Sequence, residues 1–90
     1  MQVVFAKKAR KDLDFFAKSG NKNALSKIAD LIEDIQQHPF EGIGKPEPLK
    51  YNLSGKWSRR INQEHRLVYQ VTADDTIEIL DILSLKGHYE

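Results

Sequence analysis

The sequence predicts an α+β fold in which an N-terminal strand and a helical hairpin pack on a C-terminal antiparallel β-sheet. Three features predict it: a β-prone start, two stretches with apolar residues at helical spacing, and three strand-like runs after residue 56. A chain of 90 residues can form one compact hydrophobic core but hardly two. We therefore expect a single domain over residues 1–90.

The first element is a short strand at residues 2–5, where the sequence Gln-Val-Val-Phe has high β-propensity. A helix follows, because Ala9, Leu13 and Phe16 recur at spacings of four and three and therefore share one helical face. Turn-forming residues at positions 19–21 end this helix.

The second helix has the clearest helical pattern in the chain. Asn21 or Asn23 can cap its start, and Pro39 ends it, because the residue before a proline is pushed out of the helical region. The short turn between the two helices predicts an antiparallel hairpin. The apolar face of the second helix consists of Leu25, Ile28, Leu31, Ile32 and Ile35.

Residues 39–56 form a long loop that is rich in glycine and proline. A loop of this length is uncommon in a compact domain, and it is more often functional than idle. We expect one short strand inside it, at residues 49–51.

Side-chain alternation predicts how the next two strands, at residues 57–61 and 66–71, are paired. Their large apolar residues occupy odd positions, whereas Arg60 and Arg66 occupy even positions. Facing residues of an antiparallel pair share one side of the sheet. A hairpin connection of three or five residues therefore places both arginines on the side away from the helices. The last strand, at residues 76–85, is apolar on both faces near its middle, which is typical of a central strand.

The composition narrows the class of protein. The absence of cysteine excludes disulfides and thiolate–metal sites. No apolar run approaches the roughly 20 residues that span a bilayer, and the first residues lack the apolar region of an export signal. We therefore expect a cytoplasmic protein with no membrane contact. The net charge is only +1, but residues 43–66 hold six basic residues against two acidic ones, which predicts a local anion-binding site.

Five side chains in and after this basic segment could cleave RNA. Attack by the RNA 2′-OH requires a base for its proton, an acid for the leaving 5′-oxygen and cations for the charged transition state. Glu47, between two prolines, is the candidate base, and Arg60 and Arg66 are candidates to bind the phosphate. His88 is the candidate acid, and Tyr89 could stack on a base or bind the phosphate. No spacing of histidine and acidic residues predicts a metal site, so we expect no metal and no other cofactor.

Several of the charged residues have simpler explanations. Neighbouring cations would make Glu47 a weak base, so a structural or substrate-positioning role stays open. Arg59 is either structural or a contact to RNA. Lys45, Lys50 and Lys56 are candidates for binding mRNA or ribosomal RNA phosphate, although each could be ordinary surface charge.

Four aromatic or imidazole side chains outside this group are expected to be structural. Trp57 and Tyr69 are most simply core residues on the helix-facing side of the sheet. His38 lies at a helix C-terminus, where a cation interacts favourably with the helix dipole. His65 lies in the hairpin connection and is expected to be a turn residue.

The basic segment also carries a specific sequence resemblance. The chain resembles the YoeB/Txe toxin family, which implies a RelE-like fold. It also implies a toxin of a type II toxin–antitoxin system that cleaves translated mRNA in the ribosomal A site. The resemblance assigns catalytic roles to the five residues proposed above. It is carried by residues 44–50 (GKPEPLK), 52–55 (NLSG), 57–61 (WSRRI) and 65–69 (HRLVY), and by the C-terminal pair His88 and Tyr89.

The same resemblance implies particular partners. These are a YefM-like antitoxin, the 70S ribosome with its A-site mRNA, and operator DNA only when the toxin is bound to its antitoxin. A homodimer is left open. The alternative is a non-catalytic binding module that acts as antitoxin partner and operator co-repressor. Cleavage of a translated message distinguishes the two.

Overall fold

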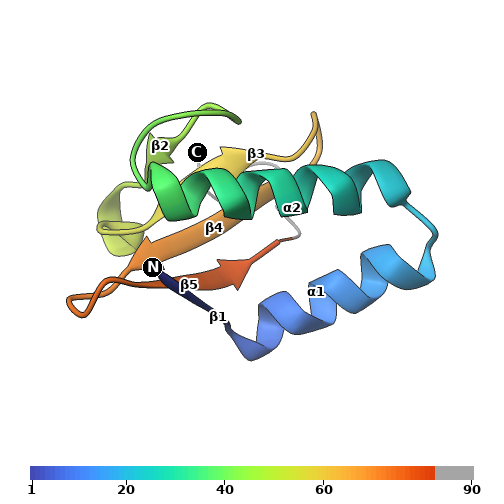
Figure 1. Ribbon diagram of the computed structural model, residues 1–90, viewed down its shortest axis with the longest axis horizontal. Coiled ribbons are helices and arrows are strands. Elements are labelled where there is room, and N and C mark those ends of the chain that lie inside the picture. The colour runs from blue at the N-terminus through green and yellow to red at the C-terminus, as the bar shows by residue number, and fades with distance from the viewer. Residues whose placement is uncertain (83–90) are drawn as a thin grey trace.

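The computed structural model describes residues 1–82, and in it two helices pack on one face of a five-stranded sheet (Figure 1). This is the α+β architecture that the sequence predicts. The strands are β1 (Gln2–Phe5), β2 (Glu47–Pro48), β3 (Trp57–Arg60), β4 (Arg66–Val71) and β5 (Thr76–Asp81). The helices are α1 (Lys7–Lys18) and α2 (Lys22–Gln37), and a 3₁₀ turn occupies Tyr51–Leu53.

The strand order is β1-β5-β4-β3-β2, and the sheet is mixed. The pairs β2–β3, β3–β4 and β4–β5 are antiparallel, and the last two form the expected meander. In contrast, β1 runs parallel to β5, with Gln2 opposite Thr76. This parallel pair was not predicted, because neither strand alone reveals its partner. It places β5 between two neighbours, so β5 is an interior strand of the sheet, as its sequence predicts.

The pairing of β3 with β4 confirms the alternation argument. Trp57 faces Tyr69, and Arg60 faces Arg66, so facing positions differ by an even number. The connection between the strands covers residues 61–65, which is one of the two lengths expected. Both arginines therefore lie on the sheet face opposite the helices.

The helical hairpin forms as the turn chemistry predicts. Gly20 has a positive φ of 72°, which glycine adopts without steric cost. The Asn21 side chain then caps α2 by accepting a hydrogen bond from the backbone N–H of Ala24 at 3.1 Å. At the other end, α2 stops at Gln37 and His38 is its C-cap, directly before Pro39.

The core lies between the helices and the sheet. From the sheet it includes Tyr69, and the half-buried Trp57 packs against it, so both residues are structural as expected. The buried apolar residues from the helices are Ala9, Phe16, Ala24, Ile28, Leu31 and Ile35.

Neither α1 nor α2, the two helices among residues 1–82, has the length and hydropathy needed to cross a membrane.

One expected strand is displaced along the chain. The short strand predicted at residues 49–51 forms instead at Glu47–Pro48. Leu49 turns inward and is buried, and its N–H bonds to the carbonyl of Lys56 at 2.9 Å. Tyr51 has a positive φ of 58°, which is incompatible with an extended strand. The last predicted strand, residues 76–85, is present as β5 to Asp81, and its end lies outside the described residues.

Candidate functional site

The backbone of Glu47 is fixed by the sheet. Glu47 and Pro48 form β2 and pair with Ser58 and Trp57 of β3. Because facing residues of an antiparallel pair share a side, Glu47 lies on the same face as Ser58 and Arg60. Its side chain is 62% exposed, so the carboxylate is accessible to a ligand.

The carboxylate of Glu47 forms an ion pair with Arg66. Its Oε2 atom lies 3.5 Å from Nη1 of Arg66, whose side chain is half-buried. Arg66 comes from β4, so β3 lies between the two residues in the strand order. The contact therefore joins side chains from the two strands on either side of β3.

Arg60 completes this group. It lies directly opposite Arg66, and within residues 1–82 it forms no ion pair of its own. Like charges directly opposite each other destabilise a sheet, so the pair favours an added anion. The structure thus brings Glu47, Arg60 and Arg66 together on one face of the sheet. The two other predicted members of the group, His88 and Tyr89, lie outside the described residues.

An open pocket of about 370 Å³ extends from Arg60 toward helix α2. Its lining includes three basic residues, Lys27, Lys45 and Arg60, and no acidic residue among those that the structure describes. Gly44, Ile61, Asn62 and Gln63 supply backbone, apolar and amide groups. Cations, amides and an apolar wall are suited to a nucleotide, which offers a phosphate and a base.

Lys27 was not predicted as a site residue. It lies 16 residues before residue 43, where the basic segment begins, and on a helix that the sequence defines by its apolar face. A helical position next to Ile28 carries no signal for a phosphate contact. Only the fold places it beside Lys45 and Arg60.

The remaining predicted lysines lie around the turn that follows β2. Lys50 is exposed, whereas Lys56 is half-buried and its carbonyl accepts the Leu49 N–H bond. Between them stands Tyr51, which is 88% exposed and was also overlooked. An exposed aromatic ring beside a lysine can stack on a nucleic-acid base.

Arg59 was expected to be either structural or a contact to RNA. Its side chain is fully buried on the helix side of the sheet. A guanidinium with no exposed surface cannot bind RNA directly, so the structural role is the one supported. Alternation places position 59 on the helix side, but it does not reveal the hydrogen-bond acceptors that a buried guanidinium requires.

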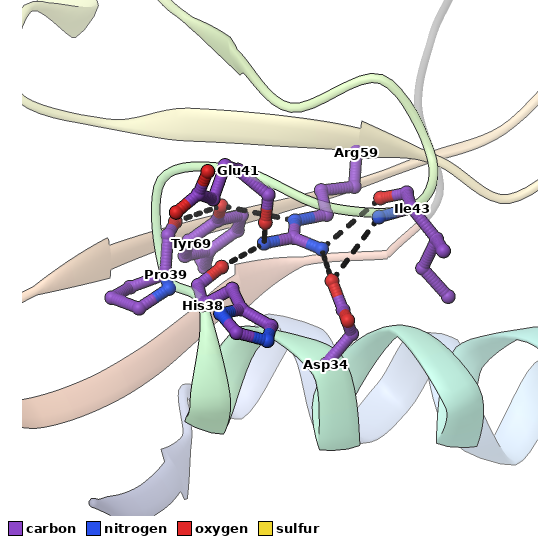
Figure 2. Close-up of polar contacts among 7 residues, drawn as sticks. All are labelled: Asp34, His38, Pro39, Glu41, Ile43, Arg59 and Tyr69. Carbon is purple, nitrogen blue, oxygen red and sulfur yellow. Dashed lines mark hydrogen bonds and ion pairs between the residues drawn. The ribbon is translucent and has the colours of Figure 1, made fainter.

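Figure 2 shows what surrounds the Arg59 guanidinium. Nε donates to the Tyr69 hydroxyl at 3.2 Å, and Nη1 donates to the Ile43 carbonyl at 3.0 Å and to the Asp34 carboxylate. Nη2 donates to the carbonyls of His38 and of Glu41, the latter at 2.7 Å. All five N–H groups of the guanidinium therefore have acceptors.

Arg59, Asp34 and Tyr69 form one polar cluster, and their contacts and burial change the pKa values of Asp34 and Tyr69. The hydrogen bond from Arg59 lowers the pKa of Asp34 below its ordinary value, against the opposing effect of burial. Burial raises the pKa of the Tyr69 hydroxyl, and the hydrogen bond from Arg59 opposes that change. Asp34 is therefore the carboxylate that balances the buried charge of Arg59.

The two described histidines lie outside this group. His38 is the C-cap of α2, and its carbonyl accepts from Arg59. His65 lies at the end of the hairpin connection and packs edge-on against Phe16, with ring centroids 5.2 Å apart. Within residues 1–82, no cluster of three or more histidine and acidic side chains is arranged to hold a metal.

Comparison with known proteins points to one family. Residues 5–89 match the family model described as the YoeB-like toxin of bacterial type II toxin–antitoxin systems. The Toxin YoeB of Synechocystis sp. is 47% identical over 90 residues, covering all of this chain and 99% of that protein.

Solved structures agree with this similarity. A YoeB/ParE toxin from Agrobacterium tumefaciens superposes with a TM-score of 0.87 at 38% identity, over 92% of this chain and 96% of that one. YoeB from Staphylococcus aureus has been solved as a dimer and in a complex with YefM, at 42% and 44% identity. Both superpose with a TM-score of 0.83 over 93% of this chain and 95% of the other.

Proposed function

The chain belongs to the YoeB-like toxins of bacterial type II toxin–antitoxin systems, and from this premise we propose that it is a ribosome-dependent endoribonuclease. Its substrate is translated mRNA in the ribosomal A site. The observation that carries the proposal is the exposed ion pair of Glu47 with Arg66, 3.5 Å apart, directly beside Arg60.

The reaction is an attack by a 2′-OH of the message on the adjacent phosphorus. Glu47 takes the 2′-OH proton, the new O–P bond forms, and the bond from phosphorus to the 5′-oxygen breaks. Arg60 and Arg66 stabilise the negative charge that develops on the phosphate oxygens. His88 gives a proton to the leaving 5′-oxygen and Tyr89 stacks on a base or binds the phosphate. The products are a 2′,3′-cyclic phosphate and a 5′-OH, and no metal or other cofactor takes part.

Glu47 has two candidate roles in this scheme. As a general base it accepts the proton, and as a positioning residue it holds Arg66 by their ion pair. The exposure of its carboxylate supports the first role, because the base must reach the 2′-OH. The phosphate of bound RNA neutralises part of the arginine charge near the Glu47 carboxylate. The carboxylate then holds a proton more readily and is a better base.

The basic pocket extends the RNA-binding surface away from the scissile bond. Lys27 and Lys45 bind the phosphate of a neighbouring nucleotide, and Arg60 is shared between the pocket and the reacting phosphate. Lys50 and Lys56 bind mRNA or ribosomal RNA beside the exposed ring of Tyr51. Since these contacts release counterions, affinity for the ribosome falls as salt rises.

The proposed partners follow from the relatives. The complex of the Staphylococcus aureus YoeB with YefM supports a YefM-like antitoxin for this chain, and the dimer of that protein supports a homodimer. Operator DNA is bound only by the toxin–antitoxin complex. Because its substrate is mRNA on translating ribosomes, the protein acts in the cytoplasm.

Primer extension on a message that is being translated tests the proposal. Wild-type protein should produce new 5′ ends within the reading frame when ribosomes are active, and none on the same RNA without ribosomes. Glu47→Gln, which keeps the side-chain shape, should abolish them. If wild-type protein leaves the message intact on active ribosomes, the protein is a non-catalytic binding module that acts through its antitoxin and operator.

A further inference from the structure

We propose that Arg59 is a positioning residue that holds the backbone leading to Glu47 in the conformation required for RNA cleavage. This inference rests on the proposed function, in which Glu47 acts on the message. Arg59 itself is fully buried and touches neither RNA nor the Glu47 carboxylate. It acts through the irregular segment 38–46, which joins helix α2 to strand β2 (Figure 2).

The Arg59 guanidinium binds this segment at several points. It donates to the carbonyls of His38, Glu41 and Ile43. The Tyr69 hydroxyl, which accepts from Arg59, donates in turn to the carbonyl of Pro39 at 2.6 Å. Four carbonyls among six consecutive residues are thus held by one buried side chain and its tyrosine partner.

Asp34 closes the cluster from the helix side. Its Oδ2 atom accepts from Arg59 and also from the backbone N–H of Ile43, the latter at 3.1 Å. Ile43 is therefore fixed by its carbonyl and by its N–H at the same time. The loop cannot shift at Ile43 without breaking bonds to both Arg59 and Asp34.

The two backbone neighbours of Arg59 hold the next part of the same segment. The N–H of Arg60 donates to the carbonyl of Gly44 at 2.6 Å, and Ser58 pairs with Glu47. Strand β3 therefore fixes the segment by its backbone on one side and by the Arg59 side chain on the other. Few residues separate Ile43 from Glu47, so a displacement at the cluster is passed on to the carboxylate.

Two glycines show how closely the segment lies against the cluster. A Cβ atom at Gly42 would lie 2.0 Å from Oδ2 of Asp34, and one at Gly44 would lie 3.3 Å from Cβ of Arg59. Both glycines also have positive φ angles, of 117° and 79°. The path of the loop is therefore set by contact with the cluster as well as by hydrogen bonds.

The arrangement requires an arginine. A lysine ammonium has three donors and no planar fork, so it cannot satisfy five acceptors in these directions. An apolar residue would avoid the desolvation free energy of a buried charge. A buried ion pair rarely compensates for that cost. An apolar residue would, however, leave the loop carbonyls without donors. Arg59 therefore serves to orient the loop carbonyls rather than to stabilise the fold, and we infer that this orientation places Glu47.

The test uses Tyr69→Phe and Arg59→Lys. Tyr69→Phe keeps the core ring but removes the bonds to Arg59 Nε and to the Pro39 carbonyl, and it is the variant that should still fold. Ile77→Val, a small change in the buried part of β5, is the control for lost stability. The measurements are kcat and KM for ribosome-dependent cleavage, well below the unfolding temperature, and hydrogen exchange of the backbone amides of residues 41–47.

Both variants should lower kcat about tenfold to a hundredfold, leave KM unchanged and speed exchange in the loop. Ile77→Val should lower only the unfolding temperature. The inference is overturned if Tyr69→Phe has the wild-type kcat and the wild-type rate of loop exchange. Inactivity of Glu47→Gln in the same assay would show that the proposed function still stands. Full activity of Glu47→Gln would instead overturn the proposed function, and loop exchange would still report whether Arg59 and Tyr69 order the segment.

Discussion

Arg60 and Arg66 face each other directly across β3 and β4, and the carboxylate of Glu47 lies beside Arg66. Two like charges in this position repel each other in the free protein. The free energy lost to this repulsion is recovered when a phosphate binds between them. The arrangement is therefore better suited to binding an anion than to stabilising the fold.

This relationship predicts opposite effects of one substitution on stability and on activity. Arg60→Gln relieves the repulsion, so it should leave the free energy of unfolding unchanged or raise it by about 0.2–1 kcal/mol. The same change should lower cleavage of translated mRNA about 100-fold or more, because a transition-state cation is lost. Denaturant unfolding and cleavage rates, measured on the same preparation, check both parts. A variant that is destabilised and fully active would contradict the assignment.

Lys27 provides a test of the basic pocket. Lys27→Ala should weaken binding to the ribosome and reduce the dependence of the logarithm of affinity on salt by about one unit, because one phosphate contact is lost. The value of kcat should not change, since Lys27 lies away from the scissile bond. Lys18→Ala, which removes an exposed lysine from the last turn of α1, is the matched control. Equal salt dependence in the two variants would exclude Lys27 from the RNA-binding surface.

Asp34 makes part of the stability depend on pH. Its pKa is lowered in the folded protein by the hydrogen bond from Arg59. A depressed pKa stabilises the fold at pH values above the ordinary value of 3.8, and this contribution is lost as the pH falls through the folded pKa. Asp34→Asn should therefore be destabilised at neutral pH, and its difference from wild type should shrink as the pH falls below about 4. Unfolding followed from pH 7 to pH 3 measures this, with Asp30→Asn as control. A constant difference across that range would contradict the role of Asp34.

Gly42 tests how tightly the loop is held. Gly42→Ala places a methyl group against the Asp34 carboxylate at a φ of 117°, so it should cost about 1–3 kcal/mol of unfolding free energy. Gly55 also has a positive φ, but a Cβ there meets nothing within 4 Å. Gly55→Ala should therefore cost less, and it should leave cleavage intact. Thermal unfolding compares the two, and equal losses would show that the contact with Asp34 is unimportant.

The sequence predicts the local features of the fold well, because these depend on residues close together in the chain. The Asn21 cap, the helix end before Pro39 and the even register that places Arg60 opposite Arg66 all follow from short-range rules. The parallel pairing of β1 with β5 does not, since the two strands lie at opposite ends of the chain.

The candidate site is only partly predictable for the same reason. Glu47, Arg60 and Arg66 stand out as charged residues within one segment and on one face. Arg59 also stands out as charged, but its burial depends on acceptors from α2, from β4 and from the loop after α2. Lys27 reaches the pocket only because the fold brings its position on α2 near Lys45 and Arg60. Contacts of this kind appear only once the elements are assembled.

Attack by the 2′-OH is tested most directly with a message that carries a single 2′-deoxyribose at the nucleotide where the wild-type protein cuts. Ribosomes stalled with this position in the A site are mixed with the protein, and the RNA ends are analysed. If the 2′-OH is the nucleophile, the unmodified message gives a 2′,3′-cyclic phosphate, and the deoxy message binds normally but stays uncut. Cleavage of the deoxy message at the normal rate would contradict attack by the 2′-OH, and with it the role assigned to Glu47, Arg60 and Arg66.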